Sequence, residues 1–567
     1  MKLIIKEYLS LLKESKELDN LIPELLLGMG HEVISRPKIG VRQYGIDVAS
    51  VGIDEDGIKK VFLFTIKEGH LSRNDWNGGS SQAVKPSLDE IVDDYIPTHL
   101  EEDYTSLVKK IVVATSGNLQ QNVQLNWSNY TKKYSKKDEI EFDFWGGDKL
   151  SLLIDEYIFN EHIVPQNLRS KFRRTLALLG DTDYNLIDYF EFLDEILLKN
   201  KLETKNDKEI LKNLRLIFLS LNVTTYWSKS EDNLKHALIA SERTLLNLYN
   251  FMISNNLMKK RKLKELLYKV YQIYFNNIKE YSHKIYPSIE VENGLSFRGY
   301  DFIQESLILF EQLGIVALYG NLYYSSVYIN QNEDKDEFKY SEYKNIKKHL
   351  KLMIKNHKGL YNPVYDEHII DISLALNLLE LWNEIEFIDK WIHNLINHIW
   401  FAYYQAKYFP IDTNDFEDLV DCNLGDAKEK NEYMKTSTLI PTLAFWCVKL
   451  GLIENYKYLH SIVSEIYEDT TLQIWFPDKD LEKYVYIEKA SIESGHVFAP
   501  LPIKEKISDM AEMIEKLRDS EHILDLENSE MPILYFVSSR HFRMPILPHI
   551  LMSDMDIILD NYDFRAK

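Results

Sequence analysis

Three charged side chains in the first 70 residues could together carry out metal-assisted chemistry on a phosphodiester. Glu24 lies in the apolar stretch at residues 21–30, Asp47 lies in Tyr44-Gly-Ile-Asp-Val-Ala-Ser, and Lys67 ends the run Val61-Phe-Leu-Phe-Thr-Ile-Lys. Two carboxylates can hold a hard divalent cation through oxygen. An adjacent ammonium can orient a water or stabilise charge that develops on a phosphate. These residue types therefore indicate a metal-dependent phosphodiesterase site.

The surrounding sequence predicts elements that would bring these side chains together. A polar turn at residues 53–57 separates two apolar runs, which predicts a β-hairpin. Because side chains alternate between the two faces of a strand, Thr65 and Lys67 should share one face, and Asp47 would meet Lys67 across the hairpin if it faces the same way. Upstream, Asp19 or Asn20 is expected to cap a helix that carries Glu24. A charged Glu24 in an apolar run needs a partner, and a metal shared with Asp47 would be one.

This ordered pattern resembles the PD-(D/E)XK nuclease superfamily, in particular its Mrr-like restriction endonuclease branch. That family has a helix Glu, a short apolar stretch ending in Gly, Gly-x-Asp on one strand, and acid-or-Gln-x-Lys on the next. The matching elements here look like Glu24, Gly45-Ile46-Asp47 and Thr65-Ile66-Lys67. The resemblance continues through strands expected at 110–117 and 139–145 and helices expected at 118–133 and 147–154. It covers about the first 155 to 175 residues.

The resemblance implies an α/β domain of the restriction-endonuclease type, a mixed sheet flanked by helices. It implies that Mg²⁺ or Mn²⁺ is held by Glu24, Asp47 and the backbone carbonyl of Ile66. It also implies that the residues acting on the scissile phosphate are Asp47, Lys67, Glu24 and Thr65. The expected activity is endonucleolytic cleavage of DNA, with RNA as an alternative substrate, in bacterial anti-phage defence or restriction.

Thr65 departs from the family pattern, which has Glu, Asp or Gln at this position. A hydroxyl is a weaker and neutral metal ligand, so two carboxylates, a backbone carbonyl and waters would have to complete the coordination shell. The alternative interpretation is therefore a catalytically inactive binding or scaffold protein that has kept the nuclease fold.

The length and composition of the chain indicate a globular protein that contains more than this one domain. At 567 residues the chain is too long for one hydrophobic core, and its 45% hydrophobic residues are enough for a globular protein. Only two cysteines occur, which argues against a disulfide framework and for a reducing compartment. No uncharged apolar run of roughly 18 residues and no signal-peptide pattern is found. We therefore expect a cytoplasmic protein without a membrane partner.

The negative charge is unevenly distributed. The net charge is −21, but residues 1–174 contain 23 Lys and Arg against 27 Asp and Glu, a difference of −4. Basic residues in this segment form two groups, Lys132, Lys133, Lys136 and Lys137, and Arg169, Lys171, Arg173 and Arg174. They could contact nucleic-acid phosphates. An exposed helix face and a linker are the alternative explanation for the same charges.

The remainder of the chain has helical periodicity, with apolar residues three and four apart in nine stretches between residues 188 and 451. The predicted organisation is a nuclease-like domain at 1–175, a large all-α domain at 176–530 and a C-terminal extended and capping segment at 531–567. The all-α domain, an irregular helical array, would sense a trigger, regulate the nuclease or form an oligomer. Because two strand cuts require two active sites, a homodimer or larger homo-oligomer is expected, with an unidentified partner or phage trigger.

The C-terminal segment at 532–548 combines apolar runs with Arg540, His541 and Arg543. Pro545 and Pro548 disfavour a regular helix there. We expect an extended segment that caps the helical domain, with a docking strand or an anion-binding loop as alternatives.

Overall fold

The computed structural model describes most of the chain, in two compact units. The described residues are 2–10, 12–36, 44–78, 83–157, 164–165, 167–198, 207–296, 301–329, 337–406, 410–413, 415–424, 433–477, 485–486, 495–498, 501–518 and 530–546. Unit 1 comprises residues 1–240 and 257–270, and unit 2 comprises residues 241–256 and 271–567.

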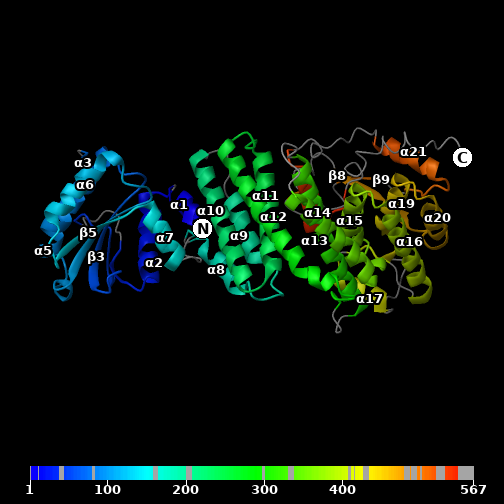
Figure 1. Cartoon of the computed structure of the whole chain (residues 1–567), viewed down its shortest axis with the longest axis horizontal. Coiled ribbons are helices and arrows are strands. Elements are labelled where there is room, and N and C mark those ends of the chain that lie inside the picture. The colour runs from blue at the N-terminus through cyan, green and yellow to red at the C-terminus, as the bar shows by residue number, and fades with distance from the viewer. Residues whose placement is uncertain are drawn as a thin grey trace. The chain divides into compact units, whose positions relative to one another are not determined.

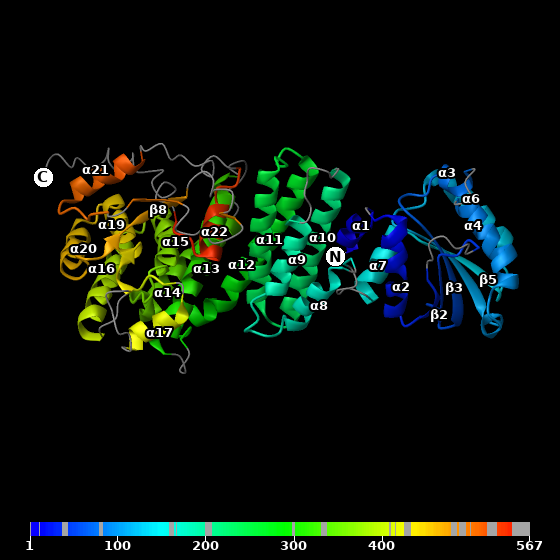
Figure 2. The ribbon, with the colours of Figure 1, turned by 180° about the vertical axis from the view of Figure 1, so that it is seen from behind.

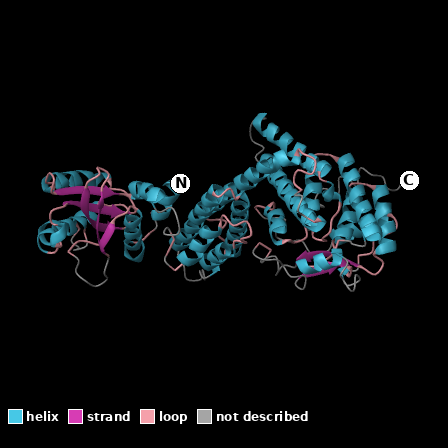
Figure 3. Ribbon diagram, turned by 90° about the horizontal axis from the view of Figure 1, so that it is seen from below, coloured by secondary structure: helices cyan, strands magenta, loops and turns pink. Residues whose placement is uncertain are grey.

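Unit 1 contains a five-stranded mixed sheet (Figure 3). Its strands, in spatial order, are β1 (Glu32–Ser35), β2 (Val48–Ile53), β3 (Lys59–Lys67), β4 (Val108–Thr115) and β5 (Ile140–Trp145). The first three strands pair antiparallel, and β3, β4 and β5 pair parallel. The predicted hairpin and mixed sheet are therefore confirmed. Strand β1 was not predicted from the sequence.

Helices cover both faces of this sheet (Figure 1). They are α1 (Lys2–Leu9), η1 (Glu14–Leu18), α2 (Asp19–Gly28), α3 (Arg73–Asn77), α4 (Val84–Glu90), η2 (Ile91–Tyr95), α5 (Ile96–Thr98), η3 (Glu102–Tyr104), α6 (Gln121–Tyr134) and α7 (Gly147–Tyr157). Val61 and Leu63 of β3 belong to the core under α3, α4 and α6. Phe64 points to the other face, where its ring contacts Trp145. The alternation predicted for β3 is thus observed.

Unit 1 continues beyond the boundary predicted at residue 175, which falls inside α8 (Arg169–Leu178). Helix α8 packs against α9 (Ile187–Leu198), and α10 (Asp207–Ser230) packs against α1. Lys212 of α10 forms an ion pair with Glu17 of η1. These helices are part of the same compact unit as the sheet.

Unit 2 is almost entirely helical. Helices α11 (Leu234–Ser254) and α12 (Arg261–Ile289) contribute residues to both units. The helices that follow belong to unit 2 alone: α13 (Phe302–Ile329), α14 (Glu337–Asn356), η6 (Lys358–Tyr361), α15 (His368–Leu381), α16 (Ile385–Phe401), η7 (Ala402–Ala406), α17 (Phe416–Leu424), α19 (Leu439–Lys449), α20 (Ile453–Ile466), α21 (Ile507–Arg518) and α22 (Leu534–Phe542). Two small two-stranded sheets pair β6 (Thr436–Ser437) with β7 (Thr471–Leu472) and β8 (Ile474–Pro477) with β9 (Gly495–Phe498). The region is therefore mainly helical, as predicted, but not all-α, because the two small sheets were not expected.

Helix α13 is both long and strongly apolar. Among the described residues, its stretch Phe302–Ser326 is long and apolar enough to cross a membrane, but 67% of its most apolar window is buried inside the fold. A largely buried helix of this kind is typical of the core of a soluble protein.

The C-terminal segment differs from the prediction. Residues 534–542 form helix α22, which packs against α13 and α15 (Figure 2). The extended interpretation of this stretch was wrong, because the two prolines lie after the helix and do not interrupt it. Arg543 ends α22 in a left-handed conformation, with φ of 54°. Residues 547–567 lie outside the described residues.

A partly buried ion network, centred on the buried Lys60 and Asp54, connects the hairpin turn to β4 and β5. The Nζ of Lys60 donates hydrogen bonds to Asp54 at 2.8 Å, Asp56 at 2.5 Å and Glu141 at 2.8 Å. The Nζ of Lys110 donates to both carboxylate oxygens of Asp54, at 2.9 and 2.8 Å. Burial raises the pKa of Asp54, but hydrogen bonds from Lys110 and Lys60 outweigh it and lower this pKa to about 2.

This network predicts that unit 1 loses stability in acid. A depressed carboxyl pKa stabilises the fold fully above the unfolded value of about 3.9, and this stabilisation is lost as pH falls toward 2. Urea unfolding between pH 5 and about pH 2 should show a steeper loss of stability for wild type than for Asp54→Asn. Equal pH dependence of the two proteins would contradict the ionised state of Asp54.

Candidate active site

Asp47 is fixed at the edge of the sheet, immediately before β2. Its backbone N–H donates to the carbonyl of Phe64 at 2.8 Å, and its Oδ2 accepts a hydrogen bond from the N–H of Ile66 at 2.6 Å. The chain reaches this position through Gly45, whose φ is 77°. A Cβ at Gly45 would lie 2.2 Å from the carbonyl oxygen of Ser87, so only glycine fits.

Lys67 lies at the end of β3 and forms an ion pair that the sequence did not predict. Its Nζ donates to Oε1 of Glu14 at 3.1 Å, and Glu14 belongs to η1, immediately before α2. The Lys67 side chain is 14% exposed and that of Glu14 is 40% exposed. The ammonium is therefore close to solvent on the side where Glu14 lies.

Asp47 shares its electrostatic environment with Lys67 and two other acids. Burial raises its pKa most; the Ile66 N–H and Lys67 lower it, and Glu14 and Asp19 raise it again. The net effect is a raised pKa, so the ionised form of Asp47 is disfavoured in this site. A bound cation would favour that ionised form.

Asp19, the first residue of α2, has an unusual environment. Its Oδ1 is buried and has no hydrogen-bond partner. Burying a carboxylate oxygen without a partner is costly. Asp19 thus supplies an oxygen that a cation could use, close enough to Asp47 to raise its pKa.

The structure places Glu24 in a different environment from the one expected. Its Oε1 lies 3.8 Å from Nη1 of Arg36 and 3.7 Å from Nη1 of Arg169. Glu24 is not among the groups with the largest influence on Asp47. The guanidinium groups supply the counter-charge that a shared metal was expected to provide.

Thr65 is buried in β3, whereas the backbone of the next residue, Ile66, contacts Asp47. Thr65 is only 1% exposed, and its strand position pairs with Val113 of β4. Ile66 directs its N–H toward Asp47. Because the N–H and C=O of one strand residue point to the same side, the Ile66 carbonyl faces the Asp47 side as well.

These residues offer few ligands for a divalent cation. Within the described ranges, no three His, Cys, Asp or Glu side chains gather closely enough to hold a metal ion by themselves. Asp19 and Asp47 are two carboxylates within electrostatic reach of each other, and Ile66 lies beside Asp47. Mg²⁺ commonly binds through one or two carboxylates and keeps several waters. The unpartnered Oδ1 of Asp19 and the disfavoured charge of Asp47 fit such an ion.

The predicted basic cluster lies away from this site. Lys132 and Lys133 are in the last turn of α6, and Lys136 and Lys137 follow it; all four are exposed. They precede the N-terminal end of β5, which runs parallel to β3 through β4. Since Lys67 is at the C-terminal end of β3, the cluster lies at the opposite end of the sheet.

The second basic cluster makes contacts within unit 1. Arg169 lies beside Glu24, the Nζ of Lys171 lies 3.0 Å from Glu191, and Nε of Arg174 lies 3.3 Å from Asp188. These ion pairs join α8 to α2 and α9.

Comparisons with known proteins gave no match. No protein-family model matches the chain, and neither a curated protein nor a solved structure matches it.

Sequence reasoning did not include Glu14 or Asp19 in the site. Asp19 was considered only as a helix cap, and the structure shows no side-chain capping bond at the start of α2. The available signal was spacing: Asp19 and Glu24 are five residues apart, so they do not lie side by side on one face of a helix.

Proposed function

We propose that unit 1 is a metal-dependent nuclease that cleaves phosphodiester bonds in DNA. The observation that supports this proposal is that Asp47, whose carboxylate is held by the Ile66 N–H, lies within electrostatic reach of Lys67 and Asp19. A mixed five-stranded sheet that presents an acid and a lysine from adjacent strands agrees with the PD-(D/E)XK resemblance.

Mg²⁺ or Mn²⁺ held by Asp19, Asp47 and the Ile66 carbonyl would lower the pKa of a water and neutralise phosphate charge. Contacts within the protein would position the Asp47 carboxylate and the Lys67 ammonium for this reaction. The Ile66 N–H orients one oxygen of Asp47 and leaves the other available. Lys67 is held by Glu14 as an ammonium, and an incoming phosphate would compete with Glu14 for it. The cation and Lys67 would then stabilise charge in the transition state.

In the family that the chain resembles, this activity serves bacterial restriction and anti-phage defence. Unit 2 would then sense a trigger, regulate cleavage or bring copies of the chain together. Cleavage of both strands of a duplex would require two copies of the site, which is the argument for a homo-oligomer.

A second candidate function is a nuclease-fold scaffold without activity. Two observations favour it: Thr65 is buried and offers no carboxylate, and Lys67 is already paired with Glu14. In that case the site would bind DNA or a partner without hydrolysis.

One experiment separates the two functions. The full chain is incubated with supercoiled plasmid, linear DNA and RNA, in Mg²⁺ or Mn²⁺ and in EDTA, and Mn²⁺ is titrated in by calorimetry. Cleavage that needs the metal supports the nuclease. Absence of both cleavage and Mn²⁺ binding, with and without DNA, supports the scaffold. In either case Thr65→Val, which keeps the shape and removes the hydroxyl, tests whether that oxygen contributes.

A further inference from the structure

Helix α14 in unit 2 carries an unbroken lysine face. Its members are Lys344, Lys347, Lys348, Lys351 and Lys355, which we call the lysine face. At 100° per residue these five positions fall within an arc of roughly 100° around the helix axis. Every position of that arc between residues 344 and 355 is a lysine. Lys358 follows at the start of η6.

The lysine face is a local cluster of positive charge in a part of the chain that is otherwise acidic. Residues 342–358 contain six lysines and one acid, Glu342, a net charge of +5. Glu342 is turned inward, where it accepts hydrogen bonds from Tyr319 at 2.6 Å and His283 at 2.7 Å. Glu342 is therefore paired inside the fold, and the acids that contact the lysines come from neighbouring elements.

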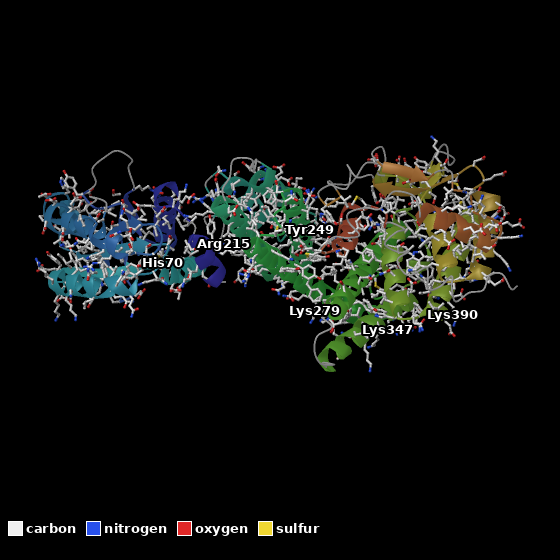
Figure 4. The ribbon with its side chains drawn as sticks, turned by 90° about the horizontal axis from the view of Figure 1, so that it is seen from above. His70, Arg215, Tyr249, Lys279, Lys347 and Lys390 are labelled. Atoms are coloured by element: carbon white, nitrogen blue, oxygen red, sulfur yellow. The ribbon has the colours of Figure 1, made fainter. Side chains whose placement is uncertain are left out.

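Three members of the lysine face form ion pairs with carboxylates of neighbouring elements. Nζ of Lys347 lies 2.5 Å from Glu384, which Lys351 also contacts, and Nζ of Lys348 lies 2.5 Å from Glu290. Three lysines thus share two carboxylates. Lys344, Lys348 and Lys355 are exposed, and Figure 4 shows Lys347 at the outer margin of unit 2.

We propose that the lysine face binds the phosphate backbone of a nucleic-acid duplex. Its five lysines extend over about 17 Å, at 1.5 Å per residue. A DNA duplex presents one negative charge per about 1.7 Å of its axis, so several phosphates lie within that length. Lysines on a rigid helix match such a row as point charges without reading the base sequence.

The chemistry of the surface favours this partner over an anionic membrane. Membrane-surface helices insert large apolar side chains beside their basic residues. On α14 the apolar residues Ile346, Leu350, Met353 and Ile354 are buried in the fold. These four side chains therefore do not serve as an apolar anchor, and the half-buried ring of Phe387 lies under Lys351 and Lys355.

This inference goes beyond the proposed function and does not need it. It gives unit 2 a binding role whether or not unit 1 hydrolyses a phosphodiester. If unit 1 does cleave DNA, the lysine face would add to the affinity of the chain for the duplex.

The test measures the affinity of the full chain for a fluorescent DNA or RNA duplex of about 30 base pairs, which is about 100 Å long. The measurement is made in EDTA and repeated across a series of salt concentrations. The variant is Lys344→Gln, Lys348→Gln and Lys355→Gln combined, because these three side chains are exposed. Each lost phosphate contact should reduce the slope of log K against log salt by about 0.9, so the slope should fall by up to about 2.7. We expect affinity to fall 10- to 100-fold at roughly 0.1 M salt.

A matched control removes the same charge elsewhere in unit 2. Lys457→Gln, Lys506→Gln and Lys516→Gln change three exposed lysines of α20 and the α21 region. The control should bind like wild type, and melting curves should be unchanged in both variants. The proposal is overturned if wild type fails to bind duplex in EDTA, if both triple variants bind equally, or if wild type binds phosphatidylserine vesicles and not duplex. EDTA prevents cleavage, so these outcomes do not depend on the proposed nuclease.

Discussion

Asp47→Asn and Lys67→Ala should each reduce metal-dependent DNA cleavage by roughly 10²- to 10³-fold or more, without loss of the fold. Burial and two neighbouring acids raise the pKa of Asp47, so its charge already opposes folding when no cation is bound. Asn keeps an oxygen that can accept the hydrogen bond of the Ile66 N–H. The melting temperature should therefore stay within a few degrees of wild type.

A comparison of Asp19 with Glu24 tests which acid completes the site. Asp19→Asn should weaken Mn²⁺ binding strongly, because its buried Oδ1 has no other partner. Glu24→Gln should affect stability more than metal binding, because Glu24 lies beside Arg36 and Arg169. Calorimetric titration of Mn²⁺ and plasmid cleavage give the two measurements. Strong metal binding by Asp19→Asn, with none by Glu24→Gln, would favour the original sequence assignment.

Local sequence patterns were sufficient to predict the framework of unit 1. The turn at 53–57 and the apolar runs beside it determine the β2–β3 hairpin, and alternation along β3 places Val61 and Leu63 in one core. Asp47 immediately precedes β2 and Lys67 ends β3, so the short hairpin that joins these strands places both residues at the same end of the sheet.

The partners of this pair could not be predicted in the same way. Glu14 reaches Lys67 from η1, which is 53 residues away in the chain. Whether Asp19 or Glu24 faces the sheet depends on the rotation of α2, and a one-residue change in its start rotates it by about 100°. Arg169 approaches Glu24 from α8, far along the sequence. Long-range packing, which a periodic pattern does not encode, decides these contacts.

Replacement of Arg540 by Met should produce the largest loss of stability in unit 2, roughly 3–5 kcal/mol. Nη2 of Arg540 donates to both oxygens of Glu242, at 2.5 and 2.7 Å, and Glu242 is fully buried. The same carboxylate accepts hydrogen bonds from Tyr274 at 2.8 Å and is 2.8 Å from Nδ1 of His541. Without Arg540, a buried carboxylate would lose its main counter-charge.

The pKa of Glu242 supports this expectation. Burial raises this pKa, but Arg540 and His541 outweigh it and lower the pKa to about 2. A depressed carboxyl pKa stabilises the fold above the unfolded value of about 4.3, and this stabilisation disappears as pH falls toward 2. Arg540→Met should therefore lose stability at neutral pH and show less additional loss in acid than wild type.

A paired substitution provides the control, because it separates the charge from the packing. Replacing a buried ion pair with apolar residues of similar volume is often neutral or stabilising. Glu242→Met combined with Arg540→Met should recover much of the stability that Arg540→Met loses. Calorimetry of the full chain should show the single variant melting roughly 5–15 °C lower and the double variant between it and wild type. If the single variant melts with wild type, Arg540 does not balance an ionised Glu242. If the double variant melts no higher than the single one, packing of the arginine side chain, and not its charge, holds α22 in unit 2.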